Sequence, residues 1–178
     1  MGNSSSYKNG EEEKLNETDV KLIVSVWEVL PDKDAFGQDV MIRIFQEHSA
    51  IKNKWIFATN LETEAEMLSN PQVRYHANKI IGVFDRMIAN LTVDGRTVVD
   101  DLDRLGKSHF YYEVKRTDFK HFEESMLFML KKHVPDKKIF TARCEKAWQK
   151  AFWLIANKIA DGIEAEEAKK AAPKNSLI

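Results

Sequence analysis

Residues 70–91, NPQVRYHANKIIGVFDRMIANL, carry the pattern that decides the fold. Asn70 offers a capping side chain, and Pro71 follows at the first helical position, where a missing backbone N–H costs nothing. The apolar residues then recur at helical spacing and share one stripe: Val73, Ala77, Ile80, Phe84, Ile88 and Leu91. The segment is therefore predicted to be an amphipathic helix with His76 on its apolar face.

The same periodicity continues on both sides of this segment. Apolar residues at three- and four-residue steps predict further helices after Asn16, over 36–45, over 98–109, after Thr117 as a capping residue, and after Thr141. Only 7 Gly and 4 Pro interrupt the 178 residues, and the apolar residues do not alternate as they would in half-buried strands. We expect an all-α fold, with an irregular connection through Trp55 and Phe57.

The length and composition favour one domain. Hydrophobic residues make up 43% of the chain, which is enough to bury one core without a disulfide or a structural metal. We expect this domain at 15–165, after a polar, disordered arm at 1–14 and before a C-terminal tail at 166–178. Gly162 is expected to lie beyond the packed part of the last helix.

Charge and cysteine content exclude several classes of function. The 27 Lys and Arg nearly balance the 28 Asp and Glu, so no net field favours nucleic acid. The single cysteine, Cys144, excludes an intramolecular disulfide and the paired-cysteine attachment of heme, and it favours a reducing, cytoplasmic setting. No apolar run approaches the roughly 18 residues that would span a bilayer.

The first residues, Met1 to Ser6, fit a short lipidation pattern. Gly2 stands where N-myristoylation would occur, and Ser6 occupies the position that favours a small hydroxyl residue. The alternative is an ordinary flexible arm. A single acyl chain with few basic neighbours gives at most weak, reversible membrane association.

Two histidines are candidate ligands for a metal cofactor. His109 follows Leu105 by one turn on the apolar side of its helix, as His76 lies on the apolar side of its own. A single histidine on such a face is more often a core residue, but two on separate helices, near many large apolar groups, fit a non-covalent heme. Ser108 would supply a hydroxyl, or a nearby backbone would supply a carbonyl, to accept the second N–H of His109.

Other metal centres fit the sequence less well. A di-iron carboxylate bundle needs Glu three residues before His on two helices, and none of the five histidines has one. A structural zinc site is judged unlikely because Cys144 has no histidine beside it in the sequence. The remaining histidines, His48, His121 and His133, are expected to face solvent.

Five segments in order resemble the globin family, and the likeness is strongest to neuroglobin-like and invertebrate intracellular members. They are residues 16–27, RIFQEH at 43–48, NPQVRYHANKI at 70–80, LGKSHFYYEVKRTDF at 105–119 and FTARCEKAWQKAF at 140–152. The resemblance implies the globin fold around a heme b held without covalent bonds.

The resemblance also implies roles for individual residues. His109 matches the proximal iron ligand, His76 the distal histidine and Ile80 the aliphatic residue beside the ligand pocket. The matches to proximal heme contacts are Leu105, Val114, Phe119 and Phe122, and the matches to the distal wall are Met41 and Phe45. Either Trp55 or Phe57 takes the position of a phenylalanine that the family places against the heme, and Tyr111 and Tyr112 either reach a heme propionate or pack on the surface.

Three functions are open at this point, and none of them assigns catalytic residues. The first is reversible binding of dioxygen or another diatomic gas, with His76 donating a hydrogen bond to it. The second is redox or sensing chemistry with a reductase, in which His76 itself closes on the iron. The third is a globin-shaped interaction module without heme.

Overall fold

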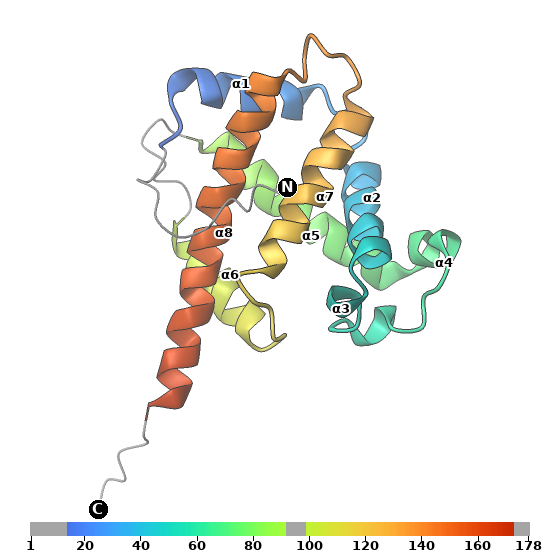
Figure 1. The fold of residues 1–178 in the computed structure, drawn as a ribbon, viewed down its shortest axis with the longest axis vertical. Helices are drawn as coiled ribbons and strands as arrows, with labels where there is room; N and C mark the ends of the chain where they lie inside the picture. The colour runs from blue at the N-terminus through green and yellow to red at the C-terminus, as the bar shows by residue number, and fades with distance from the viewer. Residues whose placement is uncertain (1–13, 92–98, 173–178) are drawn as a thin grey trace, which may run out of the picture.

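The computed structural model describes residues 14–91 and 99–172, and within them the chain is helical with no strand (Figure 1). The helices are α1 (Glu17–Glu28), α2 (Lys33–Glu47), α3 (Ser49–Lys52), the 3-10 turn η1 (Ile56–Ala58), α4 (Glu64–Ser69), α5 (Pro71–Ala89), α6 (Val99–Phe110), α7 (Asp118–His133) and α8 (Ala142–Ala171). The all-α prediction is confirmed. The polar arm up to residue 13, with the Gly2 pattern, lies outside the described residues.

Most of the predicted helix starts are made by the expected caps. The Asn70 side chain accepts hydrogen bonds from the backbone N–H groups of Gln72 and Val73, at 2.9 and 3.2 Å. Asn16 begins α1 in a reciprocal capping box, and the Thr141 hydroxyl accepts from the backbone at the start of α8. Each cap satisfies backbone donors that the first helical turn leaves without partners.

The predicted cap at Thr117 is wrong. Thr117 has helical backbone angles, and its side chain makes no capping hydrogen bond. Instead the carboxylate of Asp118, the first residue of α7, accepts from the backbone N–H of Lys115 at 2.8 Å. The chain before α7 is thus held by a side chain inside the helix.

The connection between α2 and α5 is more regular than predicted. It contains the short helices α3 and α4 and the turn η1. Thr63 and Glu66 form a capping box at the start of α4, with the Glu66 carboxylate accepting from the Thr63 backbone N–H at 2.8 Å. The spacing Thr-x-x-Glu is the sequence signal for such a box.

An aromatic cluster forms the core at one end of the molecule. Trp148 is fully buried and Trp27 is 3% exposed, and their ring centroids lie 5.9 Å apart. The rings of Phe84 on α5 and Phe152 on α8 pack against the same cluster, 5.2 Å from each other. Phe84 and Phe152 also line the cavity described below.

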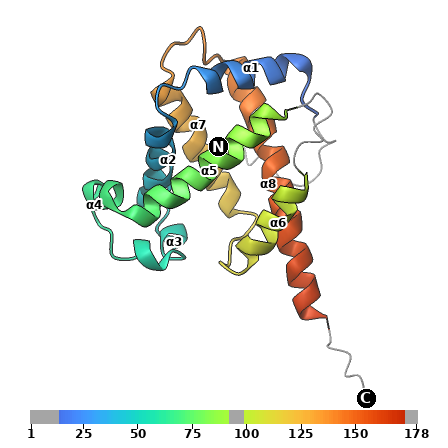
Figure 2. The ribbon, with the colours of Figure 1, turned by 180° about the vertical axis from the view of Figure 1, so that it is seen from behind.

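Helices α6 and α8 cross each other (Figure 2). Two glycines, Gly106 and Gly162, meet at the contact between them. A Cβ atom added to Gly106 would overlap the carbonyl oxygen of Ile159, and one added to Gly162 would lie 2.6 Å from the carbonyl oxygen of Asp103. The prediction that Gly162 lies beyond the packed part of the last helix is therefore wrong. Gly162 is buried, and α8 continues past residue 165 to Ala171.

The long helix α8 does not resemble a membrane span. None of the described helices combines the length and the apolar character needed to cross a bilayer. The buried residues of α8 instead lie on the side that packs against α1, α6 and α7.

Candidate functional site

An apolar cavity lies between helices α2, α5, α6, α7 and α8. The cavity has a volume of about 160 Å³ and communicates with solvent. The lining is hydrophobic apart from two lysines, one aspartate and two histidines. The histidines are His76 from α5 and His109 from α6.

The structure brings nearly all of the predicted pocket residues to this cavity. Its lining includes Met41, Phe45, Trp55, His76, Ile80, Leu105, His109, Val114, Phe119 and Phe122. Phe57 is the exception, since it lies outside the lining and meets the Trp55 ring edge-on at 5.5 Å between centroids. Of the two aromatic residues left open by the sequence, Trp55 is the one at the cavity.

The sequence reasoning missed several lining residues. They are Ile44, Ile51, Lys54, Lys79, Val83, Phe84, Asp118, Phe152, Ile155, Ala156 and Ile159. Phe84 was expected on the apolar stripe of its helix, but periodicity does not tell which part of a core a residue lines. The sequence of α8 shows an apolar stripe, but nothing in it indicates that the stripe lines the cavity.

His109 has one ring nitrogen engaged by the protein, and the other has no hydrogen-bond partner among the residues that the structure describes. Its Nδ1 lies 2.8 Å from the carbonyl oxygen of Leu105, which only accepts, so Nδ1 carries the hydrogen and donates it. Burial lowers the pKa of His109, although the hydrogen bond to Leu105 opposes this shift. A neutral ring with a lone pair on Nε2 results. The backbone carbonyl expected near His109 is thus present, whereas the Ser108 hydroxyl donates to the Arg104 carbonyl at 3.2 Å.

His76 is neutral for a similar reason. Burial, and secondly repulsion from His109, lower its pKa to about 4. The Trp55 ring meets it edge-on with centroids 4.2 Å apart. Within the described residues, neither ring nitrogen of His76 has a hydrogen-bond partner. Both nitrogens are therefore free to serve a molecule in the cavity.

The turn after α6 directs Val114 into the cavity. Glu113 has a φ of 57°, the left-handed region, and this reversal lets the Val114 backbone N–H donate to the His109 carbonyl at 3.3 Å. The Lys54 ammonium holds the turn by donating to the Glu113 carbonyl at 2.9 Å and to Asp118 at 2.6 Å. A backbone hydrogen bond thus connects the turn after α6 to the residue His109 on that helix.

The two tyrosines that follow His109 and Phe110 are mainly exposed. The Tyr111 hydroxyl donates to Glu166 at 2.9 Å, and Tyr112 is 67% exposed. His133, expected to face solvent, does not: its Nε2 lies 2.9 Å from an Asp39 carboxylate oxygen, and its side chain is 15% exposed. That expectation is corrected.

These features fit a heme. The porphyrin needs an apolar slot, and the iron needs a neutral imidazole whose other N–H is held by a second partner. The cavity provides the first, and His109 with the Leu105 carbonyl provides the second.

Comparison with known proteins agrees with this reading. The family model for globins matches residues 38–159. Neuroglobin-1 of Oncorhynchus mykiss is 30% identical over 151 residues, covering 84% of this chain and 93% of the relative. Neuroglobin of Danio rerio is 29% identical over the same length, with the same shares covered. Cytoglobin-1 of Danio rerio is 24% identical over 163 residues, covering 89% of this chain and 92% of the relative. The chain therefore belongs to the globin family, as a heme-binding and neuroglobin-like member.

Proposed function

We propose that this globin binds dioxygen, or another diatomic gas, reversibly in the cavity between His76 and His109. The observation that carries the proposal is the pair of neutral imidazoles in one apolar cavity, of which only His109 has a ring nitrogen committed to a backbone carbonyl. His109 would hold the iron of a non-covalent heme b through Nε2. When bound, the reduced heme supplies the iron that takes up the gas.

His76 would tune the affinity. A neutral imidazole carries one N–H, and the low pKa of His76 keeps it neutral throughout the physiological range. A polarised diatomic molecule in the cavity can accept that hydrogen. Such a hydrogen bond contributes about 1.5 to 3 kcal/mol, or roughly ten- to a hundredfold in affinity. The edge contact with Trp55 restricts the orientations of the ring.

The rest of the lining would hold and orient the porphyrin. Lys54 is committed to Asp118 and to the Glu113 carbonyl, so the other lining lysine, Lys79, is the better cation for a heme propionate. Phe119 and Phe122 of α7 and Leu105 of α6 supply the apolar wall around His109. Exclusion of water by this wall favours gas binding over oxidation of the iron.

A second candidate rests on the unpartnered nitrogens of His76. Because no described protein group occupies them, His76 is free to ligate the iron itself and make a six-coordinate state. An external gas would then have to displace it, which lowers the apparent affinity by the fraction of open sites. Exchange of electrons with a reductase would be the more natural role, since both oxidation states keep two histidines.

The absorption spectrum of the reduced, gas-free protein separates the two candidates. One broad visible band supports an open site, and sharp split bands support two bound histidines. If no Soret band forms after addition of heme, both are refuted and the chain serves only as an interaction module.

The His76→Leu variant tests the role of His76 in gas binding. For the gas-binding function, we expect dioxygen to dissociate roughly ten to a hundred times faster, because the hydrogen bond is lost. The matched control is His121→Leu, which alters a histidine outside the cavity lining and should leave the rate unchanged. An unchanged dissociation rate in His76→Leu contradicts the proposed hydrogen bond.

A further inference from the structure

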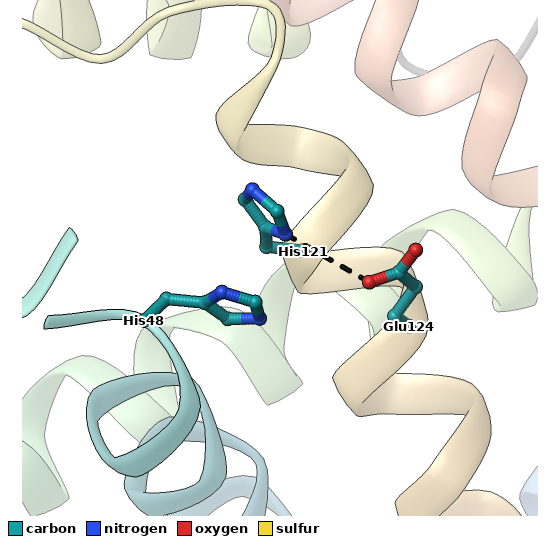
Figure 3. A group of neighbouring side chains, drawn as sticks. All are labelled: His48, His121 and Glu124. Carbon is teal, nitrogen blue, oxygen red and sulfur yellow. Dashed lines mark ion pairs between the residues drawn. The ribbon is translucent and has the colours of Figure 1, made fainter. Parts of the chain in front are cut away.

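Two histidines and a glutamate that the heme site does not use meet on the outside of α7 (Figure 3). His48 and His121 have ring centroids 3.9 Å apart and planes inclined by 33°. His121 Nδ1 lies 3.7 Å from a carboxylate oxygen of Glu124. One donor atom from each of the three residues lies within 4.8 Å of the other two.

The backbone fixes this cluster from two directions. His48 ends α2, its N–H donating to the Ile44 carbonyl at 2.9 Å, and it precedes the first residue of α3. His121 and Glu124 are three residues apart on α7 and so share one face of that helix. The expectation that His48 and His121 face solvent is therefore only partly met, because both residues are half-buried and their rings contact each other.

One ring nitrogen of the cluster has no hydrogen-bond partner among the described residues. His121 Nδ1 is buried and has no hydrogen bond, which is a costly state for a ring nitrogen. Burial, and secondly the neighbouring His121, lower the pKa of His48. Nearby charges act in both directions: Glu124 and Glu47 favour a cation here, and Arg43 opposes one.

The Glu124 carboxylate is only partly engaged by the protein. Lys120 approaches one of its oxygens at 4.0 Å, while the other oxygen is the one directed at His121. The contact to Lys120 lies at the limit of an ion pair between exposed groups, and such pairs contribute little. One carboxylate oxygen is thus free to act as a ligand.

We propose that His48, His121 and Glu124 bind a divalent transition-metal ion, best suited to Zn²⁺. Two imidazoles and one carboxylate are a known ligand set for zinc, which keeps its fourth position for water. In the tetrahedral geometry that zinc prefers, donor atoms about 2.1 Å from the ion lie about 3.4 Å from one another. The donor atoms of the cluster, which lie up to 4.8 Å apart, must therefore approach by up to about 1.4 Å, and half-exposed side chains can do this by rotation.

The proposed site needs no cysteine. Zinc was judged unlikely from the sequence because Cys144 has no neighbouring histidine, and that reasoning tested only sites built around a cysteine. The ion would connect the end of α2 to α7, three residues from Phe45 and one residue from Phe122, which both line the heme cavity. It would also stabilise the folded chain by mass action.

Equilibrium dialysis of the heme-loaded full chain against Zn²⁺ alone tests the proposal. Heme loading keeps His76 and His109 from taking the probe. We expect one bound ion per chain in the parent, with no competition from excess Mg²⁺, which prefers oxygen ligands. Glu124→Gln and His48→Asn should each weaken binding by at least about tenfold, because each removes one of three ligands.

The matched control is Glu47→Gln, the same change of charge beside the cluster. Glu47 faces Arg43 at 3.4 Å and is not one of the three ligands, so its variant loses only a nearby charge and should weaken Zn²⁺ binding much less than Glu124→Gln does. Zn²⁺ should raise the melting temperature of the parent and of Glu47→Gln, but not of Glu124→Gln. The Soret band of each variant shows whether it has folded. The proposal is overturned if the parent binds no zinc or if Glu124→Gln binds zinc as well as the parent does. It is also overturned if Glu124→Gln and Glu47→Gln weaken zinc binding equally.

Discussion

Replacing Gly106 with alanine tests how the helix crossing places the ligand His109. The added Cβ would overlap the Ile159 carbonyl oxygen and lie 2.9 Å from the Gly162 Cα. Carbon atoms in ordinary contact lie about 3.5 to 4.0 Å apart, so α6 must move away from α8 by at least about 0.6 Å. Both obstacles are backbone atoms of α8, which cannot rotate away as a side chain would.

The displacement should reach the heme site because His109 lies one turn further along α6. Overpacking of this kind costs about 1 to 3 kcal/mol in the free energy of unfolding. If about 1.4 kcal/mol of that strain is felt at the bond between His109 and the iron, heme dissociates about tenfold faster. The variant should therefore be less stable and should lose heme more quickly.

Two measurements check this expectation. Urea unfolding gives the change in stability, and transfer of heme to an excess of an apoprotein acceptor, followed at the Soret band, gives the rate of heme loss. The control is Gly82→Ala on α5, where the added Cβ would lie 3.5 Å from the flexible end of the Arg86 side chain. That variant should gain about 0.5 to 1 kcal/mol from reduced backbone entropy of the unfolded chain. If Gly106→Ala matches Gly82→Ala in stability and in heme loss, the crossing does not position the ligand.

Three further predictions concern the two histidines and the far end of α8. His109→Gly should lose most of its bound heme, measured as Soret absorbance per chain; unchanged heme content and colour would refute His109 as the ligand. The pKa of His76 is about 4 in the folded chain and 6.5 in the unfolded chain, so on acidification the unfolded chain takes up the proton first. Between pH 7 and pH 5 the free energy of unfolding should therefore fall by about 2 kcal/mol through His76 alone. Urea titrations at both pH values should show a correspondingly smaller loss in His76→Leu, and equal losses would contradict the low pKa. Tyr111→Phe should cost about 1 kcal/mol, because Glu166, only 7% exposed, loses its hydrogen-bond donor; a variant with reduced heme content but unchanged stability would instead point to a role at the heme.

Local patterns were enough to predict much of the fold. Caps such as Asn70 and Thr141 act on backbone groups two or three residues away, so the sequence that encodes them also shows where the helix begins. The placement of His76 and His109 on apolar faces follows from helical spacing in the same way. The error at Thr117 marks the limit of this reasoning, because the competing Asp118 side chain was next to it and either could have held the turn.

Contacts between residues that lie far apart in the chain could not be predicted from local sequence patterns. His133 pairs with Asp39 from another helix, and His48 meets His121 although 72 residues separate them in the chain. Gly162 looked like the end of a helix because glycine often stands there, whereas its partner Gly106 makes it a contact point.

By itself, the sequence determined the helices, the hydrophobic face of each one and the two histidines that those faces carry, because these depend on neighbours within one or two turns. Only the tertiary structure decided that Trp55 rather than Phe57 lines the cavity, that α8 supplies part of its wall and that α6 approaches α8 through two glycines. These features depend on how closely whole helices pack, and packing distances are set by side chains that are far apart in the chain.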